Sequence, residues 1–467
     1  HTNDRRQRQM CIRDRLNLVG LCGRHLGPNM PILTRYAREQ NRTERTIRPV
    51  LPALTCSAQA TYLTGKLPSE HGIVGNGWYD RKLNEHHFWK QSNQLVEGEK
   101  LWERIRRKRP GFRCAKLFWW YNMYSSVDFS ITPRPLYGSD GNKVFDVHTH
   151  PLPMREQIKR DLGEFPFSAF WGPRAGLASS KWIAAASRWI EEKHSPDLSL
   201  IYLPHLDYDL QRFGPSHPKV KNALNEVDQI AGDLIRYFEK KGVRVLVLSE
   251  YGISNVDHVI YPNRAFRSKG WLSLKKEFGG ETIDCGSSRA FALTDHQIAH
   301  VYLPHNHPTL RKKVRACLES LNGVAEVLEG EDRAGLNHQR SGDLVALAKE
   351  NAWFAYYHWE MDSLAPEFAR CIDIHRKYGY DPAELFFDPK LTLPTMRALR
   401  KLIAKRMGFR IHMDLIPLDS SVVGGSHGII PEDPLDWPVI FGPGIESASK
   451  PIQANEIFST LTELLGG

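Results

Sequence analysis

The sequence predicts an α/β protein with a central, mostly parallel sheet, helices on both faces of that sheet, and a smaller α+β insert. Apolar runs at residues 198–203 and 243–248 are each preceded by an amphipathic segment, at 180–193 and 219–240. Strands that are apolar throughout and that alternate with helices are typical of a parallel sheet buried on both faces. The 467 residues suit one large domain with an insertion, or two domains.

The other elements are expected from the same kinds of pattern. Residues 16–298 and 411–467 are predicted to form the core, and residues 299–410 the α+β insert, whose later part (361–420, running into the core) is rich in loops. The run at 16–21 is interpreted as the end of a buried strand. Further elements are expected, in chain order, at 31–40, 55–63, 309–321, 324–328, 344–348, 353–359, 439–442 and 454–465.

The first residues do not fit this pattern. The chain begins with His1 and contains the string MCIRDR, which resembles a translated sequencing adapter. We therefore interpret residues 1–15 as a non-native or disordered segment.

Composition restricts the partners and the compartment. A net charge of +10 and a pI near 9.1 favour anionic partners such as phosphate esters or nucleic acid. Specific nucleic-acid binding is not expected, because no Lys/Arg run is interleaved with aromatic residues. Seven scattered cysteines without a CxxC pair indicate reduced thiols in a cytoplasm. No membrane partner is expected, because no stretch approaches the roughly 18 apolar residues of a spanning helix.

The stretch from Pro52 to Asp80 carries the strongest chemical signal. Thr55 opens a predicted helix and stands nine residues before Thr64-Gly65, and the segment PSEHGIVGN ends at Asn76. A helix N-terminus offers N–H groups and a positive dipole end to a phosphate. A threonine hydroxyl becomes a nucleophile once it is activated, and an Asn amide donates to a developing oxygen charge. The alternative is that Thr55 is only a helix cap.

Three further polar segments follow strands or lie in a Gly-rich turn. They are PHLDYDLQRFGP at 204–215, SEYGI at 249–253 and GGSHGI at 424–429. In open α/β sheets, ligands bind at the carboxyl ends of the strands, so these loops are expected to gather beside Thr55. Taken singly, each Asp or His in them is as well explained by a cap or a solvated group.

Together these segments resemble the alkaline phosphatase superfamily, in its nucleotide pyrophosphatase/phosphodiesterase (type I phosphodiesterase) branch, which is related to phosphonoacetate hydrolase. The resemblance covers nearly the whole chain from about residue 16 and implies an alkaline phosphatase-like core. It implies a metal-dependent hydrolase of phosphodiester, pyrophosphate or related phosphate and phosphonate substrates. Thr55 would be the nucleophile and Asn76 a donor to a phosphate oxygen.

The resemblance also implies two divalent ions, usually zinc, about 4 Å apart. The first ion would be held by Asp207, by Gln211 where the family has a His, and by His427. Asp and His are zinc ligands, but the Gln amide is a much weaker one.

The second ion would be held by Thr55 and by Glu250 and Tyr251, which stand where the family has an Asp-His pair. The family's Asp on the first strand is replaced by Val19. Asn17 lies two residues earlier, on the same face of the strand, and is the candidate in its place.

Several alternatives stay open. Asp373 and His375 are extra candidate ligands, because an Asp-x-His in an extended loop turns both side chains to one side, and Asp295-His296 and His205 are others. Each is equally explained by a hydrogen-bonded or surface group. The oxygen-rich set would also suit manganese or a single ion. A degenerate relative that binds an anionic ligand without turnover is the alternative function.

Overall fold

A nine-stranded sheet forms the centre of the computed structural model, which describes residues 12–39, 45–139, 143–304, 307–409, 411–446 and 450–466. The strand order is β23-β2-β22-β11-β1-β10-β5-β6-β9, and the five strands from β11 to β6 are parallel to one another, whereas β22 and β9 flank them in antiparallel pairing. The sheet strands are β1 (Ile12–Leu18), β2 (Arg45–Arg48), β5 (Cys114–Leu117), β6 (Phe129–Pro133), β9 (Val147–His150), β10 (Leu198–Leu203), β11 (Arg244–Leu248), β22 (Val439–Phe441) and β23 (Ile452–Gln453).

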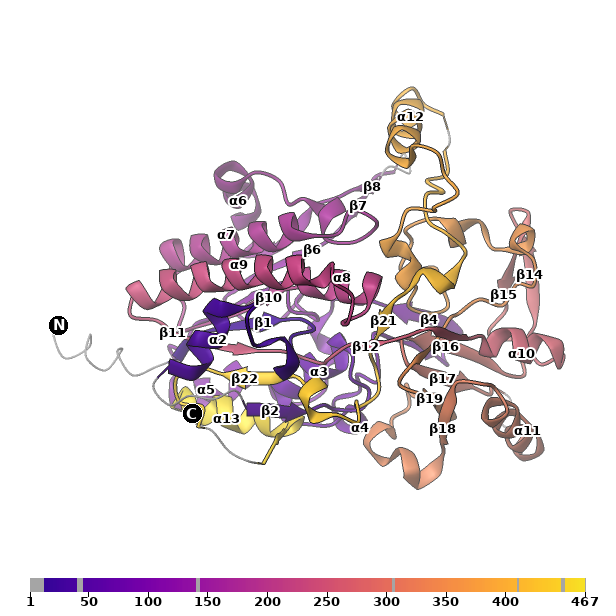
Figure 1. Cartoon of the computed structure of the whole chain (residues 1–467), viewed down its shortest axis with the longest axis horizontal. Coiled ribbons are helices and arrows are strands. Elements are labelled where there is room, and N and C mark those ends of the chain that lie inside the picture. The colour runs from indigo at the N-terminus through magenta and orange to yellow at the C-terminus, as the bar shows by residue number, and fades with distance from the viewer. Residues whose placement is uncertain are drawn as a thin grey trace.

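Helices cover both faces of this sheet (Figure 1), as the sequence predicts. On one face, α7 (Leu177–His194) packs on α9 (Val220–Lys240), which also contacts α2 (Pro31–Arg38). On the other face, α13 (Ile457–Leu464) contacts α3 and α5. The helices α3 (Thr55–Thr64) and α5 (Leu101–Lys108) are therefore held by the C-terminal end of the described chain.

A second, four-stranded antiparallel sheet lies beside the first, on the right in Figure 1. Its order is β16-β17-β19-β18, and α10 and α11 accompany it. A separate hydrophobic cluster, mostly drawn from residues between Val256 and Val423, fills this part. The division into core and insert at residue 299 remains a proposal. The elements are α10 (Pro262–Ser268), β16 (Phe291–Asp295), β17 (Ile298–Tyr302), α11 (Pro308–Glu319), β18 (Val324–Leu328) and β19 (Leu344–Ala348).

Short pieces connect these layers. They are α4 (Pro68–His71), β3 (Gly77–Asp80), β4 (Glu85–Phe88), β7 (Leu136–Tyr137), β8 (Lys143–Val144), α6 (Met154–Leu162), β12 (Ser254–Asn255), β13 (His258–Ile260), β14 (Leu274–Glu277), β15 (Gly280–Ile283), β20 (Ala352–Phe354) and β21 (Gly425–Ser426).

Three elements differ from the expectation. The first strand begins at Ile12, where its backbone already pairs with β11, whereas residues 1–11 lie outside the described chain. The segment after β10, interpreted as a loop, is the helix α8 (His205–Phe213). The loop-rich region contains a further helix, α12 (Pro394–Arg406), which projects at the top of Figure 1.

None of the helices in the described ranges is both long enough and apolar enough to pass through a bilayer. The six cysteines of these ranges are free thiols, and Cys11 lies outside them. The cytoplasmic location expected from the cysteines stays a prediction.

Candidate active site

Thr55 is the first residue of α3, as the sequence predicts. The preceding Leu54 is extended, and the helix ends at Gly65, whose φ of 70° is the left-handed conformation that glycine adopts without strain. All ten residues of the helix are buried, so it is fixed on every side. The Thr55 hydroxyl is therefore presented from a rigid helix start.

A chain of hydrogen bonds leads away from this hydroxyl. Thr55 Oγ1 lies 3.0 Å from the Tyr251 oxygen, and the Tyr251 hydroxyl donates to Asp207 Oδ1 at 3.2 Å. Because Tyr251 has one proton and gives it to Asp207, the bond to Thr55 requires the threonine to donate. Gln211 Nε2 donates to Asp207 Oδ2 at 2.7 Å, and the Tyr380 hydroxyl donates to Gln211 Oε1 at 2.7 Å. Asp207 and Gln211 meet because they are four residues apart on α8.

Glu250 accepts two amide groups at the end of the central strands. Asn17 Nδ2 and Gln59 Nε2 both donate to Glu250 Oε1, the latter at 2.5 Å. Asn17 lies near the end of β1, level with Leu248 of β11, and this register places it beside Glu250. Val19 belongs instead to the main hydrophobic cluster. Sequence reasoning missed Gln59, although its spacing of four residues from Thr55 places both on one face of α3.

Asn76 is held next to the start of α3. Its Oδ1 accepts from the backbone N–H of Cys56 at 3.1 Å. Its Nδ2 donates to Asp295 Oδ1 at 3.0 Å, and its backbone N–H donates to Asp295 Oδ2 at 2.7 Å. Asp295, at the end of β16, thus orients the Asn76 amide and is a positioning residue. One of the two Nδ2 hydrogens is used in this bond, and the other is not.

Four aromatic rings form a continuous stack beside this network. Tyr251 lies on His427, His427 on His296, and His296 on Tyr380, with centroid separations of 3.6, 3.8 and 3.8 Å. His427 Nδ1 lies 2.8 Å from the Ala53 oxygen, so it is the protonated nitrogen. Burial lowers the pKa of His427 to about 3, and the ring is neutral. Sequence reasoning also missed Tyr380, which no motif indicated.

Burial also raises the pKa values of the carboxyl groups of Asp207, Glu250 and Asp295. It raises the pKa of Asp207 to about 7, against the opposing hydrogen bonds from Tyr251 and Gln211. It raises the pKa of Glu250 to about 8 and that of Asp295 to about 7. Pairs of titratable groups with shifted pKa values are typical of catalytic sites.

Comparisons with known proteins identify the family of the chain. The family model described as type I phosphodiesterase / nucleotide pyrophosphatase matches residues 16–381, which is most of the chain. The chain belongs to this family. The match contains Thr55, Asn76, Asp207 and Glu250, whereas His427 lies beyond it.

Individual relatives of the phosphodiesterase family are distant. An uncharacterized pyrophosphatase/phosphodiesterase of Schizosaccharomyces pombe is 27% identical over 216 residues, 44% of this chain and 37% of that protein. Ectonucleotide pyrophosphatase/phosphodiesterase family member 1 of Homo sapiens is 22% identical over 236 residues, 49% of this chain and 21% of that protein. The aligned part thus spans well under half of these curated relatives.

Solved structures confirm the fold of this phosphodiesterase family member. Murine ectonucleotide pyrophosphatase/phosphodiesterase 5, in an inactive Thr→Ala form in complex with AMP, superposes with a TM-score of 0.58 at 14% identity, covering 98% of this chain and 95% of that one. Phosphonoacetate hydrolase from Sinorhizobium meliloti 1021, in complex with phosphonoformate, gives 0.58 at 16% identity, covering 97% and 96%.

Three other candidate ligands do not join this hydrogen-bond network. Asp373 and His375 lie in a turn and not in an extended loop, since the Arg376 N–H donates to the Asp373 oxygen. Asp373 pairs with Arg376 at 3.9 Å, and His375 Nδ1 lies 3.0 Å from the Phe88 oxygen. His205 Nε2 lies 2.7 Å from Glu226.

The phosphodiesterase family generally depends on divalent metal ions. The question is whether the side chains of this site could bind such ions. Pairs of zinc ions take mostly His and Asp, whereas four of the positions here hold Asn, Gln, Tyr and Thr. Across the described residues, no three His, Cys, Asp or Glu side chains cluster in a way that would hold a metal. Buried and unpaired oxygens remain at Asn17 Oδ1 and Glu250 Oε2. Such a set differs from a zinc pair and fits one cation that prefers oxygen.

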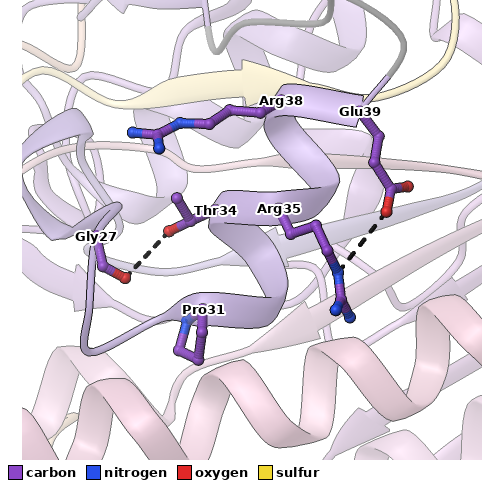
Figure 2. Close-up of a pocket in the computed structure, with 6 residues that line it drawn as sticks. All are labelled: Gly27, Pro31, Thr34, Arg35, Arg38 and Glu39. Carbon is purple, nitrogen blue, oxygen red and sulfur yellow. Dashed lines mark hydrogen bonds and ion pairs between the residues drawn. The ribbon is translucent and has the colours of Figure 1, made fainter.

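Surface hollows lie away from this network. One of about 510 Å³, lined by residues of the segment Gly27–Glu39, sits on α2, where Thr34 donates to the Gly27 oxygen and Arg35 pairs with Glu39 at 3.7 Å (Figure 2). Another of about 720 Å³ is lined by residues around Pro28 and His217. The network residues line neither hollow, and Thr55 is only 4% exposed.

Proposed function

We propose that the protein hydrolyses phosphodiester or pyrophosphate bonds of nucleotide-like substrates, or related phosphate and phosphonate esters, with Thr55 as the nucleophile. The observation that carries this proposal is the hydrogen-bond chain from Thr55 through Tyr251 to Asp207. It joins a hydroxyl at a helix start to a carboxyl group with a pKa near neutrality. The inactive Thr→Ala form of the murine relative supports the same role for a threonine.

The first step forms the bond between Thr55 Oγ1 and phosphorus and breaks the bond from phosphorus to the leaving oxygen. The proton of Thr55 passes to the Tyr251 oxygen while the Tyr251 proton passes to the Asp207 carboxylate. A base of pKa about 7 suits this transfer at neutral pH, because about half of it is ionised and the ionised form readily accepts a proton. In the second step the oxygen of water bonds to phosphorus while the bond from phosphorus to Thr55 Oγ1 breaks. Thr55 regains its proton from Asp207 through Tyr251, and the proton that water releases goes to solvent and balances the one that the leaving oxygen takes up.

Asn76 and the start of α3 stabilise the phosphate. The free Nδ2 hydrogen of Asn76 donates to an equatorial oxygen, and its direction is set beforehand by Asp295. The positive end of the α3 dipole faces the same group. A single divalent ion held by Asn17 and Glu250 would neutralise phosphate charge when bound.

The test compares Thr55→Ala with Thr55→Ser and with Thr61→Ala, a control on the same helix whose hydroxyl bonds His71. Rates on a chromogenic phosphodiester are measured with zinc or manganese, and melting temperatures beside them. We expect Thr55→Ala to lose activity on the order of a thousandfold or more, Thr55→Ser to keep part of it, and Thr61→Ala to keep most of it.

Two results would contradict the proposal. A folded Thr55→Ala variant with an undiminished rate would exclude the nucleophile role. A wild-type protein that binds AMP but shows no turnover with either ion would establish the degenerate, ligand-binding alternative.

A further inference from the structure

Helix α12 is a thirteen-residue helix none of whose residues is buried. Figure 1 shows it standing away from both sheets at the upper edge of the molecule. Isolated helices of about this length are marginal in water, and helices in proteins are mostly stabilised by packing an apolar face. The described chain gives α12 little such packing, so a surface outside the chain is needed to cover it.

The side chains of α12 are sorted by face. Met396, Leu399, Ile403 and Met407, at the helix end, recur at spacings of three and four and form one apolar stripe. They are between 49% and 65% exposed. The segment 394–406 contains five basic residues and no acidic one: Arg397, Arg400, Lys401, Lys405 and Arg406.

Ion pairs fix which side of α12 faces the protein. Arg397 Nη2 lies 2.8 Å from Asp414 Oδ2, and Lys401 also pairs with Asp414. At about 100° per residue, Arg397 and Lys401 lie about 115° and about 155° around the helix from the centre of the apolar stripe. The stripe is therefore turned outward, away from the segment that carries Asp414.

A second exposed apolar element lies on the same upper side of Figure 1. The antiparallel pair β7–β8 and the residue after it expose Leu136, Tyr137, Val144 and Phe145. Lys143 Nζ lies 5.7 Å from the centre of the Tyr137 ring and 5.4 Å from that of Phe145. Twelve of the eighteen large hydrophobic residues exposed in the described chain fall in 136–152 or 393–409.

We propose that α12 and the β7–β8 pair together form a docking surface for an anionic lipid bilayer. A basic amphipathic helix with an outward apolar stripe is the composition of helices that lie in the membrane interface. Aromatic rings beside a lysine are typical of the headgroup level. Two separate elements with apolar tips on one side suit a flat surface better than a groove that grips one helix.

The positive charge of the docking surface predicts that it binds anionic lipids. Basic side chains near an anionic membrane surface each strengthen binding roughly fivefold. The surface is basic on both elements, and the whole chain carries a net charge of +10. Binding of this kind is peripheral and needs no spanning helix, so it is compatible with the absence of a spanning segment in the sequence.

The experiment sediments the full chain with vesicles of phosphatidylcholine, with and without phosphatidylserine. We expect binding to the mixed vesicles only, and weaker binding as salt rises. A triple variant should bind the mixed vesicles about a hundredfold more weakly; it combines Arg400→Gln, Lys405→Gln and Arg406→Gln. Leu399→Glu with Ile403→Glu should abolish it, and these variants remain folded because neither side chain is buried.

Matched controls carry the same changes elsewhere on the surface. The first control introduces acidic residues at two exposed apolar positions outside the docking surface, by Leu83→Glu and Phe278→Glu. The second control removes three exposed charges, by Lys240→Gln, Lys241→Gln and Lys276→Gln. Both controls should bind like the wild type. Equal binding by all variants, or equal binding to both vesicles, would overturn the proposal.

Two further outcomes would replace it. In the first, sedimentation velocity shows a dimer, the Leu399→Glu, Ile403→Glu variant is monomeric, and no vesicle binding is seen. This result would assign the docking surface to a second copy of the chain. The second outcome uses calcium-loaded calmodulin as a probe for proteins with acidic helix-binding grooves. If calmodulin binds α12 and the protein binds no vesicles, the docking surface would be assigned to a protein partner.

Discussion

The ring of Tyr251 lies flat against that of His427, with centroids 3.6 Å apart and planes inclined by only 7°. This contact holds the phenol between Thr55 and Asp207, because the ring cannot rotate out of the stack without losing it. The sequence resemblance implies that Tyr251 stands at a position where the family has the histidine of an Asp-His pair. Its role here is expected to be proton transfer.

Tyr251→Phe tests this role. The ring and its stack on His427 are retained, but the hydroxyl that links Thr55 to Asp207 is lost. We expect kcat/KM to fall by about 10²–10⁴, the range of general acid–base catalysis, with a stability loss of about 1 kcal/mol. Tyr36→Phe, which removes a buried hydroxyl bonded to the Val245 oxygen, is the control and should keep its activity. An active Tyr251→Phe enzyme would exclude the relay.

The pH dependence of activity follows from Asp207. Its carboxyl group must be ionised to accept a proton, and burial raises its pKa to about 7. The rate should therefore fall on the acid side of about pH 7, and Asp207→Asn should remove most of the activity. Steady-state kcat/KM across a pH series measures this. A profile that stays flat down to about pH 4 would show that the base is another group, with the ordinary pKa of a carboxylate.

Asp295 should make stability depend on pH. Its folded pKa is about 7, raised by burial and opposed by the hydrogen bonds from Asn76, against 3.8 for the free group. Between these values the unfolded state releases the proton that the folded state keeps, so the free energy of unfolding falls as pH rises from about 4 to about 7. The slope is at most about 1.4 kcal/mol per pH unit.

Urea unfolding of wild type and Asp295→Asn at two pH values within that window isolates this effect. The variant loses stability at both pH values, because an amide cannot accept both Asn76 hydrogen bonds. When the pH is raised from the lower to the higher value, the free energy of unfolding should nevertheless fall less in Asp295→Asn than in the wild type. An equal pH dependence in the two proteins would assign the titration to other groups.

Gly65→Ala should destabilise the end of α3. The φ of 70° disfavours a side chain by about 1–2 kcal/mol. A Cβ there would lie 3.0 Å from Phe458 Cβ on α13, which adds overpacking of about 1–3 kcal/mol. Gly242→Ala, at φ 72° with open space around it, carries only the first cost and is the control. Equal melting temperatures of the two variants would mean that Phe458 moves aside freely.

The sequence predicted the fold class because buried strands and amphipathic helices have strong periodic signals. Helix α12 escaped prediction because its stripe is short and follows a segment of turns. The helix α8 was missed because Pro204 and Gly214 frame it like a loop. Thr55, Asn76, Asp207, Glu250 and His427 were all named from motifs, and the structure gathers them.

The connections within the site could not be predicted, because they depend on contacts that sequence spacing does not encode. Asp295 reaches Asn76 across 219 residues, and Glu250 takes the amide of Asn17 across 233. The turn at Asp373 shows the opposite error. An Asp-x-His pattern suggested two convergent ligands, but a turn sends the two side chains to different partners.

The hydrogen bond from His427 to Ala53 spans 374 residues, which has a consequence for how the protein matures. During synthesis Thr55 emerges early, whereas His427, one of the two inner rings of the aromatic stack, is made 374 residues after Ala53. Contacts of such long sequence separation form late, because the entropy of closing the loop must be overcome first. A nascent chain that ends before residue 427 therefore contains Thr55 without the stack beside it, and the arrangement that we propose for catalysis is completed only after His427 has been made.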